Sequence, residues 1–202
     1  MLINIPDSLT FSDYFKLNYY PRDILRHFGY SFRSEELTLP KSTMVLDDLE
    51  NLQKRLKKSL PLITFDNETA RREFLIAPVL MDLIDYTQAE LRVLYPLNAS
   101  SQLRGELDYF IESHNQLLVI EAKDENLERG FKQLAVELIA VEQMLEDNRQ
   151  YIYGAVSIGK VWQLAILDRH KKEILQDLML YRVPTDLDDL MRILVAILMR
   201  EE

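Results

Sequence analysis

Apolar and polar positions recur along the chain with two periods, one typical of helices and one of strands. Apolar residues at intervals of three and four predict five helical regions. These cover residues 12–28 (one or two short helices, broken at Pro21), 45–60, 67–86, 127–147 and 184–199. In the region 67–86, Asn67 is the expected N-cap. The expected buried stripe there consists of Ala70, Phe74, Ala77, Met81 and Ile84.

Shorter apolar runs bounded by polar residues predict strands. They cover residues 30–39, 90–97, 105–112, 117–123, 154–158, 161–168 and 174–183. Helices and strands are mixed without regular alternation, which indicates an α/β fold with one central mixed sheet flanked by helices. The segment 154–160 matches most of a phosphate-binding loop, but Val161 stands where that loop needs Ser or Thr. We therefore expect a hairpin turn there.

The segment 105–123 carries the candidate chemistry. Residues 117–120 are all apolar, as expected of a strand buried on both faces, and charge follows at Glu121 and Lys123. If residues 114 and 115 form a two-residue turn, Asp108 faces Glu121 on the neighbouring strand. A four-residue loop of 113–116 gives the same pairing, whereas a loop of odd length breaks it.

Two opposed carboxylates repel each other unless a cation lies between them. Carboxylate oxygens favour magnesium or manganese. Lys123 shares a face with Glu121 and could hold a water molecule or offset charge on a phosphate. The alternative is a surface hairpin with a solvated ion pair. The spacing alone leaves both interpretations open.

The segment resembles the active core of the PD-(D/E)XK nuclease superfamily, in which a hairpin supplies an Asp and then a Glu-x-Lys. The matching residues are Asp108, Glu121 and Lys123. The resemblance covers about residues 67–168 and implies a restriction-endonuclease-like core in the order helix-strand-strand-strand-helix-strand. It also implies a Glu from the helix before the sheet, where Glu68 matches and Glu73 competes, and a Gln from the helix after it, Gln133.

The resemblance implies a magnesium-dependent (or manganese-dependent) nuclease that hydrolyses nucleic acid, with DNA as the leading substrate. Asp108, Glu121 and Glu68 would hold the metal, Lys123 would orient water, and Gln133 would support the site. Arg71, Arg72, Lys132 and the basic cluster between Lys54 and Lys58, otherwise expected on solvated faces, become candidate phosphate contacts. Each assignment has an alternative: Glu68 could be a first-turn acid that favours the helix dipole, and Gln133 could face solvent.

Composition limits these functions. The 202 residues fit a single domain, with residues 1–60 and 170–202 flanking the nuclease-like core. No cysteine is present, which excludes thiol nucleophiles and zinc fingers. A net charge of −9 excludes a uniformly basic nucleic-acid-coating protein. Residues 101–128 hold seven acidic and two basic side chains, more than half of that net charge. A cation must therefore be bound before a phosphate backbone approaches.

Other functions stay open. The chain has no signal peptide and no apolar run of membrane-spanning length, so we expect a cytoplasmic protein without a membrane partner. A catalytically silent binding module in DNA rearrangement, defence or repair is the main alternative. A third is a helical interaction protein whose last helix, 187–199, forms a dimer surface, although core packing is the preferred interpretation of that helix. A homodimer would also fit an enzyme that cuts both strands.

Overall fold

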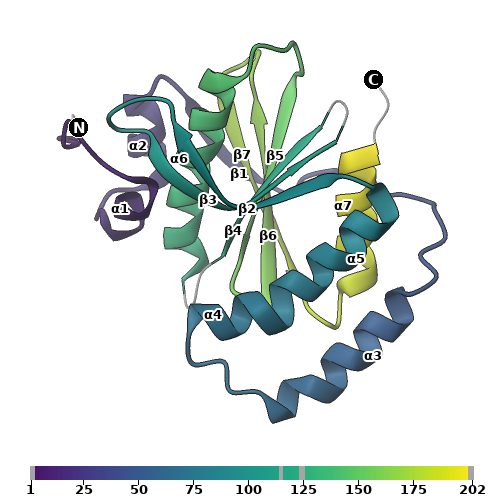
Figure 1. Cartoon of the computed structure of the whole chain (residues 1–202). Coiled ribbons are helices and arrows are strands. Elements are labelled where there is room, and N and C mark those ends of the chain that lie inside the picture. Colours follow the sequence, from purple (N-terminus) through teal and green to yellow (C-terminus); the bar gives the residue numbers. More distant parts are fainter. Residues whose placement is uncertain (1–2, 114–115, 123–125, 200–202) are drawn as a thin grey trace.

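One mixed sheet of seven strands forms the centre of the molecule (Figure 1). The computed structural model describes residues 3–113, 116–122 and 126–199. The strands lie in the order β1-β7-β6-β5-β4-β3-β2. Their bounds are β1 (Ser31–Glu35), β2 (Glu90–Asn98), β3 (Arg104–Glu112), β4 (Leu117–Ala122), β5 (Tyr151–Ser157), β6 (Val161–Asp168) and β7 (Glu173–Arg182). The expectation of a mixed sheet flanked by helices is confirmed.

Helices cover both faces of this sheet (Figure 1). They are α1 (Phe11–Lys16), α2 (Pro21–His27), α3 (Leu49–Ser59), α4 (Glu68–Arg71), α5 (Ala77–Thr87), α6 (Leu127–Met144) and α7 (Leu187–Met199), with a 3₁₀ turn η1 (Leu60–Leu62) and a π-helical turn η2 (Arg72–Ile76). Within the described ranges, no helix is both long and apolar enough to cross a bilayer.

The middle of the chain follows the order expected for residues 67–168. Helices α4 and α5 precede an antiparallel meander of β2, β3 and β4. Helix α6 then connects β4 to β5, and these two strands pair in parallel. A tight turn leads from β5 into the antiparallel strand β6, which confirms the hairpin expected at residues 154–160.

Two hydrophobic cores lie on opposite faces of the sheet. One joins α3, α5 and α7 to the sheet, and the other joins α1, α2 and α6. Helix α6 is buried along its whole central part, residues 130–141, because α1 and α2 pack on the side that faces away from the sheet. Helix α7 buries eight of its apolar side chains, so the core-packing interpretation of the last helix is confirmed.

The predicted buried stripe in residues 67–86 is wrong. Phe74 and Met81 are about half exposed, whereas Leu75, Ile76, Val79, Leu80 and Leu83 are buried. The cause is the π-helical turn η2, which lies between α4 and α5. A π turn contains more residues than an α turn, so it rotates every later position relative to an ideal helix.

Three predicted helices extend beyond the observed ones, and the last of them begins at Leu187 instead of at residue 184. Helix α3 begins at Leu49, and Val45, the expected first core position, is 75% exposed. Helix α6 ends at Met144, and its C-cap Leu145 is in an extended conformation. Apolar side chains outside a helix end can continue its spacing, so periodicity alone does not define where the helix stops.

Candidate active site

The β3–β4 hairpin has the predicted register. Tyr109 pairs with Ile120 and Ile111 with Leu118. The turn closes through two backbone hydrogen bonds, from Ser113 N to the carbonyl of Gln116 (3.0 Å) and from Gln116 N to the carbonyl of Ser113 (3.4 Å). Continuing this register by one residue beyond Tyr109 brings Asp108 level with Glu121.

Strand β3 is irregular at Asp108. The β3–β4 ladder begins one residue later, at Tyr109. The β2–β3 ladder passes from Val93–Tyr109 to Tyr95–Leu107 and omits the pair between them. Leu94, which lies opposite Asp108 there, has φ +51°, a left-handed conformation that is uncommon for leucine. Such strand irregularities re-aim side chains and occur beside active sites.

Asp108 is directed to the helical segment before the sheet. Its Oδ1 accepts a hydrogen bond from Nη1 of Arg72, on η2, at 3.0 Å, and both side chains are at most one-fifth exposed. The same Nη1 lies 3.9 Å from Oε1 of Glu68, and the guanidinium lies over the ring of Tyr109. Burial alone would lower the pKa of Arg72, but Asp108, Tyr109 and Glu68 around it hold that pKa above its ordinary value.

The N-terminus of α4 positions Glu68 near this pair. The Asn67 side chain accepts the backbone N–H of Ala70 at 2.8 Å, which confirms the predicted N-cap. Glu68 follows the cap and is four residues before Arg72, so both side chains occupy one helix face. Glu73, the alternative, is exposed on the π turn. Proximity to Asp108 through Arg72 therefore favours Glu68.

Glu121 lies on the side of the sheet that α6 covers. Its neighbour two positions back, Val119, belongs to the core on that side, and Glu121 itself is fully buried. On α6, Nε2 of Gln133 donates a hydrogen bond of 2.9 Å to Oε1 of Glu137, and both residues are buried. The alternative that Gln133 faces solvent is wrong, because residues 130–141 of α6 are buried.

Sequence reasoning did not single out Glu137 or the position of Arg72. A signal for Glu137 was present: it is a lone carboxylate within the otherwise apolar run 134–141, four residues after Gln133. A charge inside such a run costs free energy unless it has a polar role. Nothing local in the sequence connects Arg72 to Asp108, 36 residues later.

Three of the candidate phosphate contacts, Arg71, Arg72 and Lys132, are less exposed than expected. Arg71 donates from Nη2 to the carbonyl of Phe65 at 2.7 Å. Lys132 is 6% exposed and donates from Nζ to the carbonyl of Leu17 at 2.5 Å. Burial and the nearby Arg129 lower the pKa of Lys132. The solvated-face expectation is therefore wrong for Lys132, and also for Arg72, which is engaged with Asp108.

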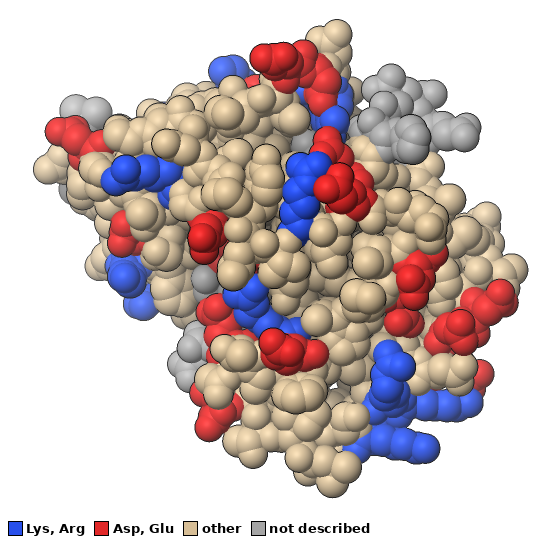
Figure 2. All heavy atoms as spheres, viewed as in Figure 1, with Lys and Arg blue, Asp and Glu red and all other residues tan. Residues whose placement is uncertain are grey.

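A solvated basic face does exist on α3. Its cationic side chains are all exposed, namely Lys54, Arg55, Lys57 and Lys58. Figure 2 shows blue side chains gathered over this helix, while red and blue are interspersed elsewhere on the same face. This face is separate from Asp108, so it does not contribute to the candidate site.

The donor chemistry fits a hard divalent cation in part. Asp108 and Glu121 offer carboxylate oxygens from adjacent strands, and Lys123 lies outside the described residues. Across residues 3–113, 116–122 and 126–199, no three potential ligands lie close enough together to form a metal cluster. Two protein carboxylates together with water and substrate oxygens are a usual environment for Mg²⁺. A cation at Asp108 would compete with the Arg72 guanidinium for this carboxylate.

Comparison with known proteins adds no assignment. The chain matches no protein-family model, no curated protein and no solved structure.

Proposed function

We propose that this protein is a metal-dependent nuclease of the PD-(D/E)XK type, with a restriction-endonuclease-like core, that hydrolyses phosphodiester bonds in nucleic acid, with DNA as the leading substrate. The observation that carries the proposal is the hairpin register, whose last pair, Tyr109–Ile120, would put Asp108 opposite Glu121 if it continued by one residue. The chain order from α4 to β5 supports the same assignment.

In this proposal each residue has a defined role. Asp108 and Glu121 hold Mg²⁺ or Mn²⁺, and Glu68 completes the ligand set or positions water. Such a cation makes bound water more acidic and offsets charge on the phosphate. Lys123 orients the attacking water and stabilises the charge that develops on the phosphate oxygens. Gln133, held by Glu137, orients groups at the α6 side of the site.

Arg72 has two roles in this mechanism. In the geometry described above its guanidinium offsets the charge of Asp108. If a bound divalent cation offset the charge of Asp108 instead, the Arg72 guanidinium would be free to contact a phosphate, for which its planar array of donors is well suited. Arg72 therefore connects the two states of the site.

Metal-dependent cleavage of a labelled DNA tests the proposal. We expect Asp108→Ala and Lys123→Ala each to lower the cleavage rate by about a hundredfold to a thousandfold, since one electrostatic group commonly contributes 10²–10³ to the rate. Asp85→Ala removes an exposed carboxylate from α5 and serves as the control, with cleavage unchanged. Cleavage that survives in both active-site variants would show that the assigned residues do not carry the reaction.

A catalytically silent binding module is the second candidate. The observation that favours it is the ion pair of Arg72 with Asp108, which already supplies a positive charge to that carboxylate. Thermal melting with and without Mg²⁺ or Mn²⁺ separates the two. A rise in Tm that disappears in Asp108→Ala supports the nuclease, and an unchanged Tm supports the binding module.

A further inference from the structure

A groove runs between α2 and β1 and continues to the first turn of α6. It consists of three cavities with volumes of about 480, 570 and 430 Å³. The first two share Arg22, Arg26 and Phe32, and the last two share Tyr20, Pro21 and Glu128. Because neighbouring cavities have walls in common, they form one continuous path, which we call the α2–β1 groove.

The α2–β1 groove contains the arginines whose side chains make no hydrogen bond or ion pair within the described residues. Among the described residues, Arg22, Arg26 and Arg129 are the only arginines whose side chains have no hydrogen bond or ion pair. All three are exposed, and Arg22 and Arg26 are one helical turn apart on α2. Since acidic side chains outnumber basic ones, 33 to 24, unpaired arginines collected along one path are unexpected unless an anion binds there.

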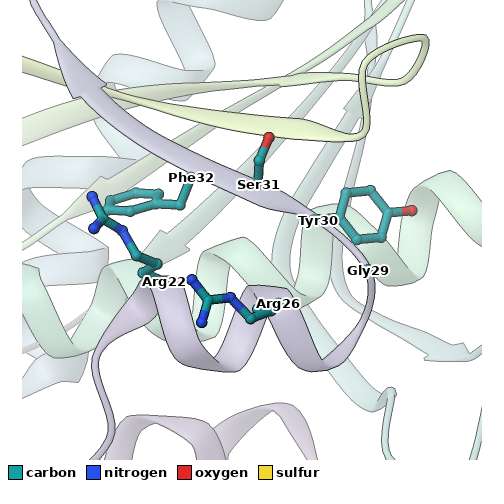
Figure 3. Close-up of a pocket in the computed structure, with 6 residues that line it drawn as sticks. All are labelled: Arg22, Arg26, Gly29, Tyr30, Ser31 and Phe32. Carbon is teal, nitrogen blue, oxygen red and sulfur yellow. The ribbon is translucent and has the colours of Figure 1, made fainter. Parts of the chain in front are cut away.

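Aromatic rings accompany these cations. Figure 3 shows Arg22 and Arg26 rising from α2 toward β1, with the ring of Phe32 beside the Arg22 side chain. Further along, Tyr20 is 75% exposed in the wall that the second and third cavities share. Four basic and two acidic side chains line the three cavities in total. Basic grooves with interspersed aromatic rings bind single-stranded nucleic acid by pairing with phosphates and stacking on bases.

We propose that the α2–β1 groove binds a single strand of nucleic acid and leads it toward the candidate active site. Each cavity is the size of a small-ligand site, so three in series exceed what a mononucleotide fills. The path ends at Asn126 and Arg129, in the α6 turn that follows β4 and Glu121. The inference rests on the proposed function for the choice of nucleic acid as ligand, and it adds the form of the substrate.

Fluorescence anisotropy with a labelled oligothymidylate of about 12 nucleotides tests the groove. The measurement is made in EDTA, so that binding is observed without cleavage. We expect Arg22→Ala/Arg26→Ala to weaken binding at least about tenfold, because two phosphate contacts are lost. Lys57→Ala/Lys58→Ala on α3 is the matched control, since it removes two exposed positive charges outside the groove, and it should weaken binding less than about twofold.

A third variant tests stacking. Phe32→Leu keeps an apolar side chain against Phe131 but removes the ring, and we expect it to weaken binding severalfold while Tm changes little. Equal weakening in the arginine and lysine pairs, or no binding by the wild-type protein, would overturn the inference. Tighter binding of a duplex of equal length, or full competition by thymidine monophosphate at equal concentration, would also overturn it.

The nuclease proposal and the groove proposal can be refuted independently of each other. If the wild-type protein binds the oligonucleotide through Arg22 and Arg26 but cleaves nothing with Mg²⁺ or Mn²⁺, the nuclease is refuted and the groove is supported. If metal-dependent cleavage occurs and is unchanged in Arg22→Ala/Arg26→Ala, the groove is refuted and the nuclease is supported.

Discussion

At the scale of single residues, Arg72 is the side chain on which the state of the candidate site depends. Its Nη1 donates to Asp108 at 3.0 Å, in a position only one-fifth exposed. A hydrogen bond to a charged group in such a setting contributes about 1.5–3 kcal/mol. Any divalent cation that binds Asp108 therefore competes with this guanidinium. This competition can be measured as a change in metal affinity when Arg72 is replaced.

We predict that Arg72→Ala binds Mg²⁺ more tightly than the wild-type protein. Removal of the competing guanidinium should lower the half-saturating Mg²⁺ concentration by about tenfold, the equivalent of about 1.4 kcal/mol. Without metal the variant should melt below the wild type, because Asp108 loses a cationic partner. Thermal melting across a Mg²⁺ titration measures both effects.

The matched control for Arg72 is Arg55→Ala. Arg55, on α3, forms another arginine–aspartate contact, with its Nη2 3.9 Å from Oδ1 of Asp82, and it is largely exposed. Its removal should leave the Mg²⁺ titration unchanged. If Arg72→Ala and Arg55→Ala respond to Mg²⁺ in the same way, competition at Asp108 is not the cause and the metal site is placed wrongly.

The residues of the candidate site differ in how far the sequence could predict them. The expectation that Asp108 faces Glu121 follows from a two-residue turn at residues 114 and 115 and from strand periodicity, both of which are local. The contact of Arg72 with Asp108 depends on how η2 packs beside β3, which no spacing encodes. The burial of Gln133 depends on α1 and α2 covering the outer face of α6, a contact between distant segments.

At the scale of elements, periodicity predicted most of the fold because each strand and helix has one buried face that the sequence marks. The exception is the segment 67–86, where the predicted buried face is wrong. The π turn η2 cannot be read from apolar spacing, because the spacing assumes 3.6 residues per turn. The side chains of Leu75 and Arg71 on this segment also lie beside Gly159 in the β5–β6 turn, so close that a Cβ added to Gly159 would meet them.

We predict that Gly159→Ala destabilises the protein more than Gly29→Ala does. Both glycines have φ +82°, so both substitutions carry the cost of a left-handed alanine, about 1–3 kcal/mol. At Gly159 the added Cβ would also lie 2.8 Å from Cδ1 of Leu75, whereas at Gly29 no atom lies within 4 Å. Thermal or urea unfolding of the two variants measures the difference. Equal loss of stability would mean that the turn does not pack on η2 as described.

At the scale of the whole molecule, the net charge and the placement of the charges have opposite implications for binding of nucleic acid. A net charge of −9 opposes broad attraction of nucleic acid. The unpaired arginines, however, lie along one path, and the exposed cations of α3 lie on another face. The net charge can be counted from the sequence, but this arrangement of charges could not be predicted from it. Arg22, Arg26 and Arg129 come together only through the packing of α2 against α6.

The arrangement predicts a modest salt dependence for binding of a single strand. Each phosphate neutralised on a single strand contributes about −0.7 to the slope of log K against log salt. Contacts from Arg22, Arg26 and Arg129 therefore give a slope of about −2. In Arg22→Ala/Arg26→Ala one contact remains, and the slope should fall to about −0.7. Anisotropy titrations at several NaCl concentrations in EDTA measure both values. A slope far steeper than −2 would require more phosphate contacts than the groove offers, and an unchanged slope in the double variant would place those contacts elsewhere.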